Sequence, residues 1–116
     1  MNRNGTYKAQ IIGPMTGLPD YNRPAFAAAA SRLRSLGYRV FNPGDWTDVP
    51  DPEALTWDDW MLRALEALDH ADVAVLLPGR SASRGSRREF ERAKERGLPM
   101  LDYGTGICRR QRGRVS

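Results

Sequence analysis

A short stretch between a predicted strand and a predicted helix carries the groups best suited to chemistry. Ser83, Gly85 and Ser86 precede Glu89, and the stretch follows the apolar run 72–77. Such a run predicts a buried strand, and the small residues after it predict a loop that opens a helix. Because the first N–H groups of a helix lack intrahelical acceptors, we expect an anion or phosphate site here. Glu89 then adds a carboxylate beside that site, in the first turn of the helix.

The same residues allow a purely structural role. Ser86 and Glu89 have the spacing of a capping box, in which each side chain accepts a hydrogen bond from the other residue's backbone N–H. The spacing alone favours this role, which is compatible with a chemical one. The helix N-terminus and the neighbouring Arg87 and Arg88 favour the ionised form of Glu89, which a nucleophile requires.

A second small-residue loop, Gly13 to Gly17, follows the predicted strand 7–12. The ends of parallel strands meet at one edge of a sheet, so we expect this loop to converge with residues 83–89 on one pocket. The loop has neither the three spaced glycines of a dinucleotide fingerprint nor the Gly-Lys-Ser/Thr of a phosphate loop. We therefore predict neither NAD nor ATP, and no cofactor.

Tryptophan side chains are candidates for stacking on a nucleobase, because aromatic faces bind bases of any sequence. Trp46 follows Asp45 in the loop after the second predicted strand, so it is the best placed of the three. Trp57 and Trp60 belong to the one-sided apolar stripe of a predicted helix, and this pattern favours core packing for both.

Alternating strands and helices predict the fold that positions these loops. The expected strands are 7–12, 38–41, 72–77 and 100–102, and the expected helices are 23–36, 57–69 and the segment around Glu89. Strands joined by helices of this length form right-handed crossovers in a parallel sheet. We expect one doubly wound α/β domain of four or five parallel strands over residues 1–103, followed by a basic, flexible tail over residues 104–116.

The charge distribution indicates no nucleic-acid surface on the folded domain. The formal net charge is +4, but without Arg109, Arg110, Arg112 and Arg114 the chain has 14 basic and 14 acidic residues. Such a tail is typical of a solvated terminus and less often of an arm that binds phosphate backbones. One Cys and one His argue against an internal disulfide and a zinc cluster. No apolar run has the length of a membrane span and no signal peptide is recognisable, so we expect a cytoplasmic protein without metal or membrane contact.

Several motifs, taken in order, resemble one known family. They are Gly13-Pro14-Met15-Thr16-Gly17-Leu18-Pro19-Asp20-Tyr21-Asn22, Asn42-Pro43, Ala71-Asp72, Leu77-Pro78-Gly79, and Ser83-Arg84-Gly85-Ser86 followed by Glu89, Ala93 and Gly97. This series resembles the phage and bacterial family of small proteins related to nucleoside 2-deoxyribosyltransferases and to 2′-deoxynucleoside 5′-phosphate N-hydrolases. The resemblance covers residues 7–102.

The resemblance implies a flavodoxin-like, Rossmann-like fold that binds nucleosides or nucleoside monophosphates and transfers a deoxyribosyl group or hydrolyses the N-glycosidic bond. It implies that Glu89 attacks the anomeric carbon, that Ser83, Gly85 and Ser86 hold a 5′-phosphate, and that the chain forms a homodimer or larger homo-oligomer. A carboxylate suits this chemistry, since glycosidic cleavage passes through an oxocarbenium-like state. The predicted substrate-binding residues are Gly13, Pro14, Met15, Thr16, Gly17, Tyr21, Asn22, Asp45, Trp46, Gly79, Ser83, Gly85 and Ser86.

Two positions depart from the pattern of that family. Its enzymes commonly carry a Tyr where this chain has Gln10, and an Asp where it has Ala64. Ala64 lies on the apolar stripe of its helix, so an Asp there would have pointed inward, toward the pocket. Two hypotheses follow: an enzyme acting on the N-glycosidic bond of deoxynucleoside monophosphates, and a nucleotide-binding module with impaired chemistry. A third, weaker hypothesis uses the arginine tail to bind nucleic acid.

Overall fold

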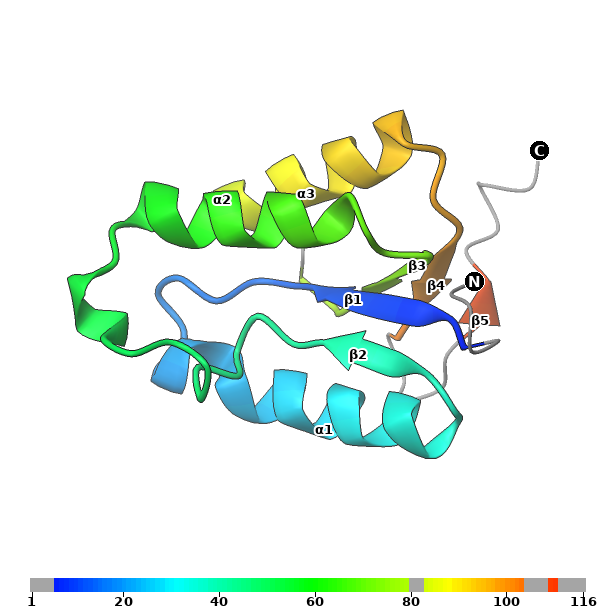
Figure 1. Ribbon diagram of the computed structural model, residues 1–116, viewed down its shortest axis with the longest axis horizontal. Helices are drawn as coiled ribbons and strands as arrows, with labels where there is room; N and C mark the ends of the chain where they lie inside the picture. Colours follow the sequence, from blue (N-terminus) through cyan, green and yellow to red (C-terminus); the bar gives the residue numbers. More distant parts are fainter. Residues whose placement is uncertain (1–5, 80–82, 104–108, 111–116) are drawn as a thin grey trace.

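Parallel pairing of four strands builds the sheet (Figure 1). The strands are β1 (Lys8–Ile12), β2 (Arg39–Phe41), β3 (Val73–Leu76) and β4 (Met100–Asp102), in the spatial order β2-β1-β3-β4. The computed structural model describes residues 6–79, 83–103 and 109–110. The predicted doubly wound α/β fold is therefore confirmed.

A fifth, two-residue strand, β5 (Arg109–Arg110), pairs antiparallel with β4. The sequence predicts that a fifth strand would also be parallel, and for β5 this prediction is wrong. The other residues of the predicted tail, 104–108 and 111–116, lie outside the described residues. Within the described ranges, no helix is both long and apolar enough to cross a membrane.

Helices cover both faces of the sheet. In Figure 1, α1 (Arg23–Ser35) lies below the strands, and α2 (Trp57–Leu68) and α3 (Arg84–Glu95) lie above them. Two short 3-10 helices, η1 (Pro19–Asn22) and η2 (Pro52–Ala54), precede α1 and α2. Strand residues alternate between the faces, so Ile11 packs in one core cluster with Phe26 of α1, whereas Ile12 packs in the other with Leu68 of α2. Burying a side chain of this size stabilises the fold by about 1.5–3 kcal/mol.

The starts of α2 and α3 follow local side-chain chemistry. At α2, the Thr56 hydroxyl accepts from the Asp59 N–H and the Asp59 carboxylate accepts from the Thr56 N–H, which forms a capping box. At α3 the N-cap is Ser83, whose hydroxyl accepts from the Ser86 N–H. The predicted capping box of Ser86 and Glu89 is therefore wrong. Because α3 begins three residues earlier than that box requires, Glu89 lies in its second turn and faces the interior.

The ends of β1 and β3 approach each other so closely that only glycine fits between them. The Leu77 N–H donates to the Ile12 carbonyl over 2.8 Å, and Gly13 follows at once. A Cβ atom on Gly13 would lie 2.8 Å from the Leu77 Cβ and 2.9 Å from its Cδ1. Leu77 is buried in the core, so it has little room to move away.

We expect Gly13→Ala to lower the free energy of unfolding by about 1–3 kcal/mol, because the added methyl group overpacks this junction. Urea unfolding followed by circular dichroism measures the change. Gly85→Ala is the matched control, since its methyl group would meet Met61 Sδ at an ordinary 3.6 Å. Equal effects of the two substitutions would contradict the tight contact at Gly13.

Candidate functional site

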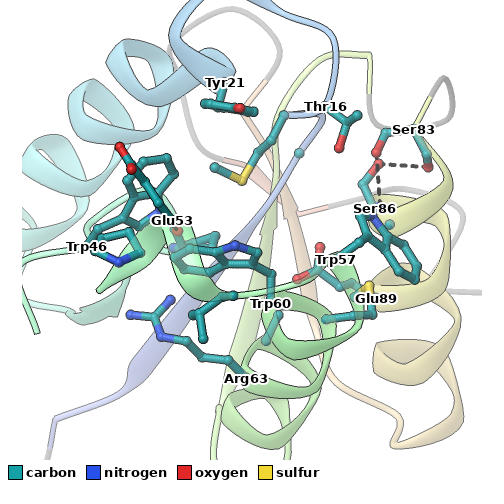
Figure 2. Close-up of a pocket in the computed structure, with 18 residues that line it drawn as sticks. Thr16, Tyr21, Trp46, Glu53, Trp57, Trp60, Arg63, Ser83, Ser86 and Glu89 are labelled. Atoms are coloured by element: carbon teal, nitrogen blue, oxygen red, sulfur yellow. Dashed lines mark hydrogen bonds between the residues drawn. The ribbon is translucent and has the colours of Figure 1, made fainter. Parts of the chain in front are cut away.

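A pocket of about 710 Å³ opens at the edge of the sheet where the parallel strands end (Figure 2). The loops after β1, β2 and β3 meet there with the first turns of α2 and α3. In the strand order β2-β1-β3-β4, the chain winds outward in opposite directions from β1 and β3, and ligand sites of open α/β sheets lie at such a switch point. The lining residues are Gly13, Met15, Thr16, Tyr21, Pro43, Trp46, Pro52, Glu53, Leu55, Trp57, Trp60, Met61, Arg63, Ala64, Ser83, Gly85, Ser86 and Glu89.

Most of the predicted site residues come together in this lining. They are Gly13, Met15, Thr16, Tyr21, Trp46, Ser83, Gly85, Ser86 and Glu89. The predicted site residues that do not line it are Pro14, Gly17, Asn22, Asp45 and Gly79. The two loops predicted to converge do so, because β1 and β3 are neighbours in the sheet.

Two of the residues outside the lining have a structural role instead. The Asn22 side-chain amide donates to the Pro14 carbonyl over 3.0 Å, which ties the loop after β1 to the start of α1. Asp45 accepts hydrogen bonds from the N–H and hydroxyl of Thr47, and these bonds lower the pKa of its carboxyl group. Asp45 lines a second, shallower hollow, together with Arg34.

The central group of the pocket is the Glu89 carboxyl, which Figure 2 shows between Trp60 and Trp57. Glu89 is only 6% exposed, and in the described part of the chain no hydrogen bond or ion pair reaches it. Burial raises its pKa to about 8. Arg87 and Arg88 are exposed on α3 and do not offset this cost. The expectation that they keep Glu89 ionised is therefore wrong, and the carboxyl is mostly protonated at neutral pH.

One end of the pocket is polar and lies at the start of α3. The Ser86 N–H donates to the Ser83 hydroxyl over 3.3 Å, and the Ser86 hydroxyl donates to the Ser83 carbonyl over 3.2 Å (Figure 2). These bonds fix the loop against the first helical turn. The N–H groups of Arg84 and Gly85 lie in this turn, where the helix itself provides no acceptor for them. Thr16 faces this end from the loop after β1 (Figure 2). The arrangement suits an anionic group.

The other end of the pocket is aromatic. The ring centroids of Tyr21 and Trp46 are 5.7 Å apart, and those of Trp46 and Trp60 are 5.2 Å apart. The Arg23 guanidinium lies 4.1 Å from the centroid of the Trp46 ring. Trp57 and Trp60 are only partly buried and line the pocket, so the interpretation that they pack in the core is wrong. This end offers flat apolar surface of the kind that binds a nucleobase.

A left-handed turn holds Tyr21 at the aromatic end. Asp20, Tyr21 and Asn22 have φ angles of 51°, 53° and 61°. This conformation costs roughly 1–2 kcal/mol for a residue with a Cβ atom and less for Asp and Asn. The turn is held by hydrogen bonds from the Tyr21 N–H to the Leu18 carbonyl over 2.9 Å and from Asn22 to Pro14. Backbone strain of this kind clusters at functional sites.

Glu53 and Arg63 also line the pocket, and neither is among the predicted site residues. Glu53 lies in η2, inside a Pro- and Asp-rich segment that reads only as a loop. Arg63 donates to the Asp48 carboxylate over 2.9 Å and stacks 4.9 Å from the Phe41 ring centroid. Ala64 is 5% exposed and lines the pocket, which confirms that this face of α2 points inward.

The fold and the pocket define an α/β protein with a pocket at the carboxyl edge of its parallel strands. Residues 7–102 match the family model described as a domain of unknown function, DUF4406, and the chain belongs to that family. No curated protein sequence matches the chain. The family description states no activity, so a function must be argued from the site.

The raised pKa of Glu89 makes stability depend on pH in a defined direction. At low pH both the folded and the unfolded chain carry the proton, so burial of the neutral carboxyl costs little. As the pH rises through the ordinary value of 4.5, the unfolded chain loses the proton while the folded chain keeps it until about pH 8. The free energy of unfolding therefore falls between these two pH values and then levels off.

We expect Glu89→Gln to remove this dependence. We compare the free energy of unfolding of the variant with that of the wild type at each pH. This difference should be about 3 kcal/mol more favourable to the variant at pH 7 than at pH 4, because its amide cannot ionise. Urea unfolding across this pH range measures the gain. Glu91→Gln, at an exposed position of the same helix, is the control and should follow the wild type. Parallel pH profiles for wild type and Glu89→Gln would show that Glu89 is not buried in a neutral form.

Proposed function

We propose that this protein cleaves the N-glycosidic bond of deoxynucleoside 5′-monophosphates, with Glu89 as the nucleophile. The observation that carries the proposal is the buried Glu89 carboxyl, which has no partner among the described residues and lies between an aromatic end and a helix start. A base stacked on Trp46 and Trp60 and a phosphate at the start of α3 leave the sugar next to Glu89. The family resemblance described above supports the same chemistry.

The reaction proceeds in two displacements at C1′ of the sugar. A Glu89 carboxylate oxygen bonds to C1′ while the bond from C1′ to the base nitrogen breaks, and the base leaves with the electron pair and takes up a proton. Water then attacks C1′, releases the Glu89 carboxylate and loses a proton, which gives the deoxyribose phosphate. If a second base replaces the water, the outcome is transfer.

The protonation state of Glu89 limits this reaction at neutral pH. With a pKa of about 8, about one molecule in ten carries the carboxylate at pH 7. The carboxylate is a far stronger nucleophile toward C1′ than the neutral acid. We therefore expect weak base release at neutral pH and faster release above pH 8.

A second candidate function is nucleotide binding without efficient chemistry. Ala64 supports it, because the α2 position that faces the pocket carries no acid to protonate the leaving base. The only other carboxyl in the described lining is that of Glu53 in η2, which Figure 2 shows near Trp46. In this case Glu89 stays neutral and the pocket holds the nucleotide. In either function we expect the chain to act as a homodimer or larger homo-oligomer.

Base release separates the two functions. Wild-type protein incubated with each deoxynucleoside monophosphate should release free base, with a rate that rises about tenfold per pH unit below pH 8 and levels off above it. Glu89→Gln should reduce the rate at least about a hundredfold while changing nucleotide affinity less than about threefold, because the amide keeps the shape but cannot attack. Chromatography of the products measures both, with Glu91→Gln as the control. Unchanged release by Glu89→Gln contradicts the nucleophile, and nucleotide binding without release at any pH favours the binding module.

The anion site at the start of α3 can be tested separately. We expect a deoxynucleoside 5′-monophosphate to bind at least about tenfold more tightly than the same nucleoside, because the phosphate gains charge-assisted hydrogen bonds there. Gly85→Asp should abolish this preference by placing a negative charge at the site, whereas Gly85→Ala should retain it. Isothermal titration calorimetry measures both affinities. Equal affinities for nucleoside and monophosphate in the wild type would place the phosphate elsewhere.

A further inference from the structure

Gln10 is a fully buried polar residue whose side chain is only half satisfied. Its amide Nε2 donates to the Ala64 carbonyl over 2.8 Å, and its Oε1 has no partner among the described residues. The amide orientation is fixed, because the reverse orientation would set Oε1 against the Ala64 carbonyl oxygen. A buried carbonyl without a donor destabilises the fold, so a donor is expected near Oε1.

Gln10 and Glu89 lie on the same side of the sheet, the side covered by α2 and α3. Gln10 is on the face of β1 that also carries Ile12, and Ile12 shares a core cluster with Ala93 of α3. Glu89 precedes Ala93 by one helical turn on the same buried stripe. Ala64, whose carbonyl holds Gln10, lines the pocket together with Glu89. Both side chains therefore enter the region between β1, α2 and α3.

We propose that the Gln10 carbonyl oxygen accepts a hydrogen bond from the protonated carboxyl of Glu89, so that Gln10 is the positioning residue that holds Glu89 neutral. The two groups are complementary in one protonation state only. A carboxylic acid has one O–H to donate, and Gln10 Oε1 can only accept. A carboxylate would instead face Oε1 with two oxygens and no proton between them, which is repulsive.

Other titratable groups do not replace this contact. Arg63 from α2, Glu53 from η2 and Tyr21 from η1 line the same pocket, and burial rather than their charges accounts for the raised pKa of Glu89. Lys8 of β1 and Asp72 before β3 have the same strand parity as Gln10, but they lie at the opposite edge of the sheet, where the Lys8 N–H donates to the Asp72 carboxylate. Asp102 of β4 also has this parity, but β3 lies between β4 and β1. Gln10 is thus the polar side chain of β1 on this face at the Ala64 carbonyl.

The chemical consequence rests on the proposed function. If Glu89 is the nucleophile, Gln10 favours the inactive protonated form and sets the pH at which the protein becomes active. The hydrogen bond itself does not depend on catalysis. It can therefore be tested by protein stability, and its failure would leave the proposed function standing.

A double-mutant cycle at two pH values tests the hydrogen bond. Gln10→Met and Glu89→Met each keep the length of the side chain and remove its polar end, and urea unfolding of the wild type, both single variants and the double variant gives their coupling. We expect a favourable coupling of about tenfold in the unfolding equilibrium constant near pH 6, where Glu89 carries its proton. Near pH 9.5 the coupling should fall below about twofold, because the O–H donor is lost.

The matched control is the Glu89→Gln background, whose amide N–H donates at every pH. In that background Gln10→Met should destabilise the protein equally at both pH values. If Glu89→Met does not fold, the comparison of Gln10→Met in the wild-type and Glu89→Gln backgrounds decides, since only the wild-type background should show a smaller loss at high pH. A coupling that is absent, or that is the same at both pH values, overturns the proposal, because packing and bridging water do not depend on the Glu89 proton.

Discussion

The close approach of β1 and β3 is the constraint from which the site follows. Both strands are buried on both faces, and at their ends Gly13 leaves no room for a side chain beside Leu77. The chain must therefore turn outward at this edge, and the loops after the two strands open on the same side of the sheet. With α2 and α3 packed above, the space between the loops and the helix starts becomes the pocket.

Burial of Glu89 links the stability of this architecture to its chemistry. The carboxyl lies on the stripe of α3 that packs toward the sheet, so the same packing that fixes the helix removes water from the acid. Because no ion pair reaches it from the described part of the chain, the group keeps its proton near neutral pH. The polar and aromatic ends of the pocket flank a neutral acid, and a ligand that supplies positive charge near it would favour its ionisation.

Periodicity and turn residues predicted β1 to β4, α1 and α2 to within about one residue at each end, because each of these elements has a clear apolar pattern. The start of α3 was misplaced since Ser83 and Ser86 both have capping chemistry, and sequence spacing does not decide which one caps. The apolar stripe of α2 was identified, but periodicity does not show that Trp57 and Trp60 line the pocket instead of packing in the core. The orientation of Glu89 depends on packing between segments that are distant in the sequence, so no local sequence pattern predicts that its carboxyl is buried.

The left-handed turn at Asp20, Tyr21 and Asn22 makes the aromatic end conditional on complete folding. Three consecutive residues with Cβ atoms do not hold positive φ angles on their own. They do so here because the Asn22 side chain donates a hydrogen bond to the carbonyl of Pro14, in the loop directly after β1. A nascent or partly unfolded chain therefore lacks a formed Tyr21–Trp46 surface. The aromatic end of the pocket is therefore present only in chains whose segment from Pro14 to Asn22 is folded.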